Sequence, residues 1–300
     1  MNMRLIDTAI KAYASILDEG DNARLAFFHE LWKVVDECEK GHECTYEAPE
    51  TSTIKAALDA GTSVFATQPV VVDKEALVED IEKLIACAKV STELAEGVPE
   101  DLARIDWNRI IDVSDIELAG ANPNAYLMDL YQILMDGGAE AGSLGIGLMA
   151  ATLALKAQLE KPAAVALAAI KKAVAFEEIH PMTCPVCGSA PTLSHVGGET
   201  SSNGRGRKLI CTQCGTSWEF ERVRCARCGT QNQRSLHFYN LEGDDNHRIG
   251  TCDECGSYIR SLFSESVLVP ISYEVEDVVM AKLDAIAQNP AFAGGGERLD

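Results

Sequence analysis

Eight cysteines in the C-terminal part of this 300-residue chain form an internal repeat that limits its possible folds more than any other feature. Two C-x2-C pairs separated by 23 residues recur once, displaced by 41 residues. The first unit consists of Cys184, Cys187, Cys211 and Cys214, and the second of Cys225, Cys228, Cys252 and Cys255. This spacing lets two thiolates of one turn bind an ion whose tetrahedral shell is completed by the second turn. The repeat therefore predicts two tandem four-cysteine metal sites.

A glycine follows each of the four cysteine pairs, at Gly188, Gly215, Gly229 and Gly256. A metal-binding knuckle folds back so tightly that the residue after its second cysteine is easiest with φ above zero, where glycine has no steric penalty. Pro185 fixes φ inside the first turn, as tight turns often require. These residues favour four similar knuckles.

Two other uses of paired cysteines fit the sequence less well than metal binding. Disulfides need an oxidising compartment, and the N-terminus has no apolar stretch of the kind found in secretory signals. A thioredoxin-like redox site would use one pair at a helix start after a strand, whereas this chain repeats four pairs. Spacing leaves zinc and mononuclear iron of the rubredoxin type both open. Four protein ligands close each site, so we expect structural or redox-active ions rather than hydrolytic ones.

The hydrophobic pattern predicts no membrane span and a cytoplasmic location. The most apolar region, 139–179, is interrupted by charged residues and by Pro162, and so falls short of the roughly 20 apolar residues of a membrane helix. In the reducing cytoplasm, eleven cysteines are more naturally metal ligands or redox groups than disulfides.

The net charge of −20 is unevenly distributed along the chain. Residues 1–180 hold 15 Lys and Arg against 31 Asp and Glu, whereas residues 181–262 hold 9 against 8. An acidic surface repels phosphate backbones and lacks the counterion release on which non-specific nucleic-acid affinity depends. The charge pattern therefore disfavours nucleic acid as a partner.

Residues 1–180 show helical periodicity, with apolar residues spaced by three and four. Helices are predicted over 5–16, 25–35, 75–90 and 102–110, beginning near Asn124 and Ser143, and again after Pro162, which suits a first helical turn. We therefore expect an acidic, all-helical N-terminal domain.

After His180 and Pro181, cysteine, glycine and short alternating runs replace the helical pattern. Short strands are predicted over 208–210, 217–223, 236–239 and 257–262, and a helix over 274–288. The expected fold is α+β and multidomain. Its predicted segments are a helical domain (1–180), a first four-cysteine ribbon (181–219), a second four-cysteine ribbon (220–263), and a C-terminal helix and tail (264–300).

Several aromatic and basic residues of the ribbons are candidates for binding a partner. Trp218, Arg222 and Arg224 alternate along one predicted strand and can share a face, and Tyr239 and Tyr258 raise the same possibility. The alternative is that the aromatic residues cover a small ribbon core while the arginines are solvated, because small modules bury little apolar surface. Both interpretations stay open at this stage.

A third metal site in the helical half is conceivable but weakly supported. Cys38, His42 and Cys44 are close in sequence, and Cys87 lies further along. No fourth ligand is specified, and cysteine is commonly a small buried hydrophobe. We therefore expect these cysteines to serve packing.

The knuckle sequences resemble a known family. The segments C-P-V-C-G-S-A-P (184–191), C-T-Q-C-G-T-S-W-E-F-E-R-V-R-C-A-R-C (211–228) and C-D-E-C-G-S-Y-I-R (252–260) are similar to the formate dehydrogenase accessory protein family, FdhE. The likeness is close over about 180–263, looser through V-E-D-V-V-M-A-K-L-D (275–284), and limited to a helical domain of similar size before that.

The resemblance implies a cytoplasmic helper protein that is needed for active formate dehydrogenase and is not itself an enzyme. It implies rubredoxin-like C-terminal modules that bind iron, and contact with the catalytic subunit during maturation. Combined with the cysteine spacing, the expectation is an assembly factor with one iron or zinc ion in each four-cysteine site. The alternatives are an iron-containing electron carrier and a ribbon-type nucleic-acid-binding protein.

Overall fold

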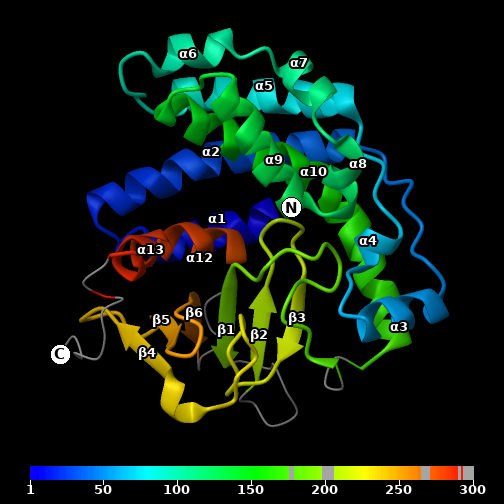
Figure 1. Ribbon diagram of the computed structural model, residues 1–300. Helices are drawn as coiled ribbons and strands as arrows, with labels where there is room; N and C mark the ends of the chain where they lie inside the picture. The colour runs from blue at the N-terminus through cyan, green and yellow to red at the C-terminus, as the bar shows by residue number, and fades with distance from the viewer. Residues whose placement is uncertain (176–178, 198–205, 265–270, 290–291, 293–300) are drawn as a thin grey trace.

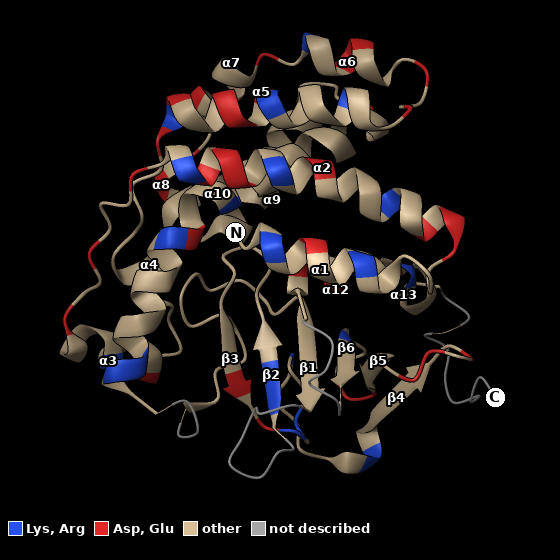
Figure 2. Ribbon diagram, turned by 180° about the vertical axis from the view of Figure 1, so that it is seen from behind, with Lys and Arg blue, Asp and Glu red and all other residues tan. Residues whose placement is uncertain are grey.

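The computed structural model describes residues 1–175, 179–197, 206–264, 271–289 and 292. Within these residues the chain forms a helical half, then a mixed six-stranded sheet, then two short helices (Figure 1). This arrangement confirms the predicted α+β fold class. Acidic residues are spread over the helices and their connecting loops, as the charge pattern indicated (Figure 2).

Helices fill the N-terminal half. They are α1 (Met3–Tyr13), α2 (Glu19–Gly41), α3 (Thr51–Asp59), α4 (Val64–Thr67), α5 (Lys74–Ser91), α6 (Val98–Arg104), α7 (Trp107–Val113), α8 (Ile116–Ala121), α9 (Pro123–Asp136) and α10 (Ala141–Ala173). Several start at a side-chain cap, such as Asp18, Ser63 and Asp73, whose oxygen accepts a backbone N–H of the first turn. The single helix predicted over 102–110 is instead α6 followed by α7, because Asp106 caps a new start.

The longest helix, α10, forms the centre of the helical half and packs against α5, α2 and α9. It continues through Pro162, where the sequence predicted a new helix to begin. Proline removes one hydrogen bond of the helix, but small buried residues on both sides, such as Ala157 and Ala166, keep it packed. By length and composition α10 would suffice to cross a membrane; however, 61% of its most apolar 18-residue window is buried, as in a core helix.

The sheet joins both cysteine repeats. Its strands are β1 (Leu193–Gly197), β2 (Arg207–Ile210), β3 (Ser217–Phe220), β4 (Leu236–Asn240), β5 (His247–Cys252) and β6 (Tyr258–Ser264), in the order β3-β2-β1-β6-β5-β4. Each repeat forms an antiparallel meander, and the parallel pairing of β1 with β6, with Leu193 opposite Arg260, joins the two. Whether each predicted segment folds as a separate unit stays a prediction.

Helices α12 (Tyr273–Val279) and α13 (Ala281–Ala287) pack on one face of this sheet and meet α1 and α2 on their other side (Figure 1). Leu283 lies in a cluster with Leu193, Ile249 and Leu262 from the strands. The sequence predicted one helix over 274–288; the backbone at Met280, with ψ near 1°, divides it into two. The end of the predicted C-terminal segment, residues 290–300, lies outside the described residues except for Phe292.

The first repeat belongs to the main hydrophobic core, which it shares with the helical half. Val186 and Trp218 are buried in one cluster with Phe65 of α4 and Leu155 of α10. The strand residues on the other face of the sheet, which face α12 and α13, form a separate hydrophobic cluster. The first cysteine site is therefore set between the helices and the sheet.

Candidate metal centres

All four cysteine pairs form the same backbone turn. The N–H of the first cysteine donates to the carbonyl five residues later, and the glycine N–H donates back to the first cysteine's carbonyl, as in Cys184–Ser189 (2.8 Å) and Gly188–Cys184 (2.9 Å). The glycines after the four pairs have φ values of 77°, 74°, 78° and 65°. This confirms the prediction of a left-handed residue at each of these positions.

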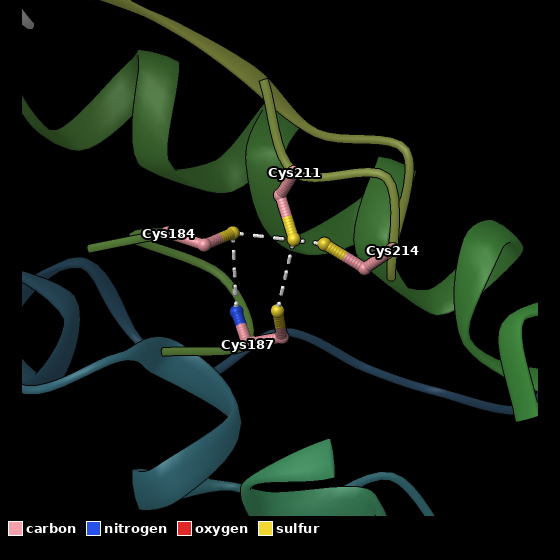
Figure 3. Close-up of side chains that lie close together, drawn as sticks. All are labelled: Cys184, Cys187, Cys211 and Cys214. Atoms are coloured by element: carbon pink, nitrogen blue, oxygen red, sulfur yellow. Dashed lines mark hydrogen bonds between the residues drawn. The ribbon is translucent and has the colours of Figure 1, made fainter. Parts of the chain in front are cut away.

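The four cysteines of the first repeat converge on one point (Figure 3). The Sγ atoms of Cys184 and Cys214 are 3.6 Å apart, as are those of Cys187 and Cys211. A tetrahedron with metal–sulfur bonds of about 2.3 Å has edges of about 3.8 Å, whereas a disulfide needs about 2 Å. The spacing of these thiols therefore matches a shared ion and not a covalent pair.

The second repeat brings Cys225, Cys228, Cys252 and Cys255 together in the same way. The Sγ atoms of Cys225 and Cys255 are 3.8 Å apart, and so are those of Cys228 and Cys252. In each repeat all four sulfurs lie within 4.8 Å of one another. Each group can hold one metal ion, and four soft sulfur ligands suit zinc or iron.

The electrostatics of the first group favour a cation. Burial raises the pKa of the Cys184 and Cys214 thiols, while hydrogen bonds from the three neighbouring thiols lower the pKa of Cys187. A thiolate in this buried group is costly without a positive charge close to it. A bound divalent ion would supply that charge and deprotonate the remaining thiols.

Hydroxyl side chains, which were not among the residues predicted from the sequence, complete the knuckles. The Ser189 hydroxyl lies 3.4 Å from the Cys187 sulfur, and the Thr216 hydroxyl 3.3 Å from that of Cys214, where each can donate to a thiolate. The sequence contains a pattern that could have predicted these hydroxyls, because every pair reads C-x2-C-G followed by serine or threonine. At Cys255, partial burial opposes ionisation, but hydrogen bonds from Ser257 and neighbouring thiols lower the pKa to about 7.

The first site is held against the helical half by backbone hydrogen bonds. At the start of α4 the N–H groups of Val64 and Phe65 donate to the carbonyls of Pro185 and Val186, each at 2.9 Å. The first N–H groups of a helix have no partner within the helix, so the knuckle satisfies two of them. The indole N–H of Trp218 donates to the carbonyl of Pro181 at 2.7 Å.

The five candidates for partner binding lie in different surroundings. Trp218 is 1% exposed and serves the core, so it offers no surface. Arg222 and Arg224 line a cavity beside the second site. Tyr258 donates to Asp284 of α13 at 3.0 Å, and Tyr239 packs edge-on against Phe292. Only the two arginines thus combine a position at a cavity with a charge.

Among the described residues, the cysteines of the helical half join no group of metal ligands. Cys38 is buried in the helical core, where burial raises the pKa of its thiol to about 12. Cys44 is exposed, and the Cys87 sulfur lies 3.5 Å from the Ser91 hydroxyl. His42 pairs with Asp80 at 2.6 Å. The burial of Cys38 agrees with the expected packing role, whereas exposed Cys44 does not.

Comparison with known proteins gives a consistent family relationship. The model of the FdhE central domain matches residues 183–222. The chain is 35% identical over 111 residues to an FdhE homologue of Aquifex aeolicus, covering 36% of this chain and 38% of that one. It is also 35% identical over 113 residues to one of Edwardsiella ictaluri, covering 37% and 34%. The aligned part thus spans little more than a third of these relatives.

A solved structure extends the likeness to the whole fold. The crystal structure of FdhE from Pseudomonas aeruginosa superposes with a TM-score of 0.54 over 95% of this chain and 89% of that chain, at 14% identity. At that identity the match concerns the fold alone. The central-domain match and the curated relatives thus show that the cysteine-rich part of this chain is similar to FdhE proteins, and the solved structure shows that the fold is shared.

Proposed function

We propose that this chain is a cytoplasmic accessory factor for formate dehydrogenase, that it binds the catalytic subunit during maturation, and that it is not an enzyme. One iron or zinc ion would occupy each four-cysteine group, held by the eight repeat cysteines. The similarity of the cysteine-rich part to FdhE proteins supports the accessory role.

The observation that carries this proposal is the closure of both cysteine groups. Four sulfurs surround each candidate ion position and leave no coordination position for a substrate. The first knuckle also anchors the sheet to the helices, through hydrogen bonds from Val64 and Phe65. An ion in such a place contributes its binding free energy to folding, which suits a rigid binding surface better than a hydrolytic centre.

The test combines metal analysis with capture of the client. We expect the freshly purified, reduced chain to contain about two ions. Tagged protein should capture the catalytic subunit of formate dehydrogenase from its native host, and deletion of its gene should abolish formate dehydrogenase activity. The double variant that carries both Cys184→Ser and Cys187→Ser should fail to capture the subunit and should fail to restore activity in the deletion strain. Normal activity in the deletion strain, with no captured subunit, would refute the accessory role.

An iron-containing electron carrier is the second candidate, and the exposure of Cys228 and Cys255 favours it. An ion whose ligands reach the surface can exchange electrons with a partner, whereas zinc has no redox chemistry. Absorption spectra of the purified chain separate the two. A reversible visible band upon oxidation and reduction supports a carrier, while a colourless zinc form excludes it.

Nucleic-acid binding, the remaining alternative, is tested by filter binding at low salt. We expect no nucleic acid to be bound.

A further inference from the structure

A cavity of about 320 Å³ lies on the sheet face opposite α12 and α13. In the first repeat this face is covered, because Leu209, Trp218 and Phe220 join the core shared with the helices. In the second repeat the same face stays open, with Phe238 44% exposed. Phe238 and Phe263 meet edge to face at 5.2 Å and form an aromatic wall. On this face of the sheet the second repeat therefore forms a cavity, whereas the first repeat is covered by the hydrophobic core.

Five arginines line this hollow, which we call the arginine cavity. They are Arg207, Arg222, Arg224, Arg227 and Arg248. His237 lines it as well, and none of the described lining residues is Asp or Glu. The chain as a whole carries a net charge of −20, whereas the charged lining side chains of this cavity are basic. The clustered arginines therefore create a local positive potential.

Of the five arginines, Arg207 most strongly indicates an anionic ligand. It is 3% exposed, no described carboxylate forms an ion pair with it, and its Nε atom has no hydrogen-bond partner among the described residues. Its Nη1 donates to the carbonyl of Arg224 at 2.8 Å, and its guanidinium lies over the ring of Phe220. Cys225 of the second cysteine group is a source of negative charge beside this buried cation, and a bound carboxylate would add a direct ion pair.

Two further arginines are oriented by their contacts. Arg248 stacks over the ring of Phe263 at 4.1 Å, and its described hydrogen bonds go to one backbone carbonyl, that of Asp245. Arg224 shares one ion pair, with Glu221 at 2.9 Å. A planar guanidinium fixed by stacking presents N–H pairs in the geometry that a carboxylate accepts.

The edge of the sheet indicates what shape the ligand has. Strand β4 is the last in the order of described strands, and its residues Leu236, His237 and Phe238 line the cavity. An edge strand offers unpaired N–H and C=O groups to an added extended segment. Alternate side chains of that segment would then face the arginines and the aromatic wall.

We propose that the arginine cavity binds an extended acidic segment of a client protein, with its carboxylates on the arginines and its apolar side chains on Phe238 and Phe263. Nucleic acid is disfavoured, because the chain as a whole carries a net charge of −20, which repels a long polyanion. A free small anion would leave the aromatic wall and the strand edge unused. The identification of the client as a formate dehydrogenase subunit rests on the proposed function.

The test uses the full-length, metal-loaded chain and a fluorescein-labelled short peptide of alternating glutamate and valine, with fluorescence anisotropy as the readout. We expect the variant Arg222→Gln with Arg248→Gln to bind at least about tenfold more weakly, since it removes two charge-assisted contacts. The matched control is Arg234→Gln, an exposed arginine of the same repeat outside the cavity, which should bind like the parent. Metal content of all three proteins verifies that the knuckles are intact.

Several outcomes would overturn the inference. Equal binding by the double variant and the control would do so, as would equal binding of a peptide with glutamine in place of glutamate. Tighter binding of a single-stranded uridine oligonucleotide, or binding of inorganic phosphate as tight as that of the peptide, would assign the cavity to another ligand class.

Capture of the formate dehydrogenase subunit separates this inference from the proposed function. If the parent chain captures the subunit and the double variant does not, both are supported. If the double variant captures it equally well, the inference fails and the function stands. If the peptide binds but no subunit is captured, the accessory role fails and the cavity remains a site for acidic segments.

Discussion

The two cysteine groups share one backbone turn and nearly equal sulfur spacing, yet their surroundings differ. In the first group each cysteine is at most 1% exposed, whereas Cys228 and Cys255 of the second are exposed. The residues between the paired cysteines explain the difference. Pro185 and Val186 occupy the first knuckle, and Val186 is fully buried, while the last knuckle contains Asp253 and Glu254. Thus both groups share the ligand geometry, while the apolar first knuckle packs against the helical half and the acidic residues of the last knuckle are exposed.

The two repeats also attach to the helices by different means. The first does so through apolar core and through the N–H groups of Val64 and Phe65. The second uses a buried polar network, in which His247 contacts Glu276 of α12 at 3.0 Å and Tyr13 of α1 at 3.1 Å. Perturbing either attachment should therefore affect the two sites unequally.

The largest expected difference comes from removing equivalent ligands, Cys187→Ser in the first site and Cys228→Ser in the second. At the buried site no water can replace the lost sulfur, so we expect a loss of about 4 kcal/mol in the free energy of unfolding. At the exposed site water can serve as fourth ligand, and a loss of about 2 kcal/mol is expected. Urea unfolding followed by circular dichroism measures both. Equal losses would show that burial does not distinguish the sites.

The ligand sets and the glycine conformations were predictable because they depend on local turn geometry. All eight cysteines and the left-handed glycines lie within short segments whose spacing alone restricts the backbone. The strands predicted at 208–210 and 236–239 agree with β2 and β4, but β1 and β5 were missed. Their residues, including Ser194, His195 and Gly250, have weak strand preference and become strands through pairing with distant segments.

What the sequence left open were the contacts between distant segments. The parallel pairing of β1 with β6 joins residues 67 positions apart, such as Leu193 and Arg260, and no periodicity within either strand indicates it. The burial of Trp218 follows from the helices that cover β3, which the ribbon alone does not reveal. The arginine cavity likewise brings together Arg207 and Arg248 from strands of different repeats.

The second attachment should depend on pH because of His247. Burial disfavours its charged form, but hydrogen bonds to Asp244 and Glu276 outweigh this and raise the pKa to about 9, from an ordinary value of 6.5. Because the folded state binds the proton more tightly, the stabilisation is complete below about pH 6.5 and is lost as the pH rises through about 9. The full effect would be up to about 3 kcal/mol.

The variant His247→Gln isolates this contribution, since glutamine can hydrogen bond but does not titrate. Tyr13, Asp244 and Glu276 stay in place, so groups outside this network titrate alike in both proteins. We expect the difference in unfolding free energy between parent and variant to shrink from pH 6.5 to pH 9, as measured by urea titration at a series of pH values. A difference independent of pH would contradict the assignment.

The first attachment should instead respond to a change at Val64. Val64→Pro removes the N–H that donates to Pro185 at 2.9 Å, at the first position of α4, where proline is tolerated. Ser63 already has the extended conformation that proline requires of its predecessor, with ψ of 157°. Compared with Val64→Ala, which controls for lost packing, we expect a further loss of about 1–2 kcal/mol. Equal stability of the two variants in urea would show that this hydrogen bond contributes nothing.

The smallest expected difference concerns the knuckle hydroxyls. Thr216 is 2% exposed and its hydroxyl contacts the Cys214 sulfur, so Thr216→Val should cost about 1 kcal/mol and weaken retention of the first ion against a chelator. Thr230 follows the first cysteine pair of the second repeat, as Ser189 does in the first, and is partly exposed. Its hydroxyl accepts from the Asn232 N–H at 3.2 Å, a contact that water can replace. Thr230→Val should therefore cost less than about 0.5 kcal/mol. Both changes keep the side-chain shape, so a larger effect at Thr230 would mean that solvent exposure does not set the importance of these hydroxyls.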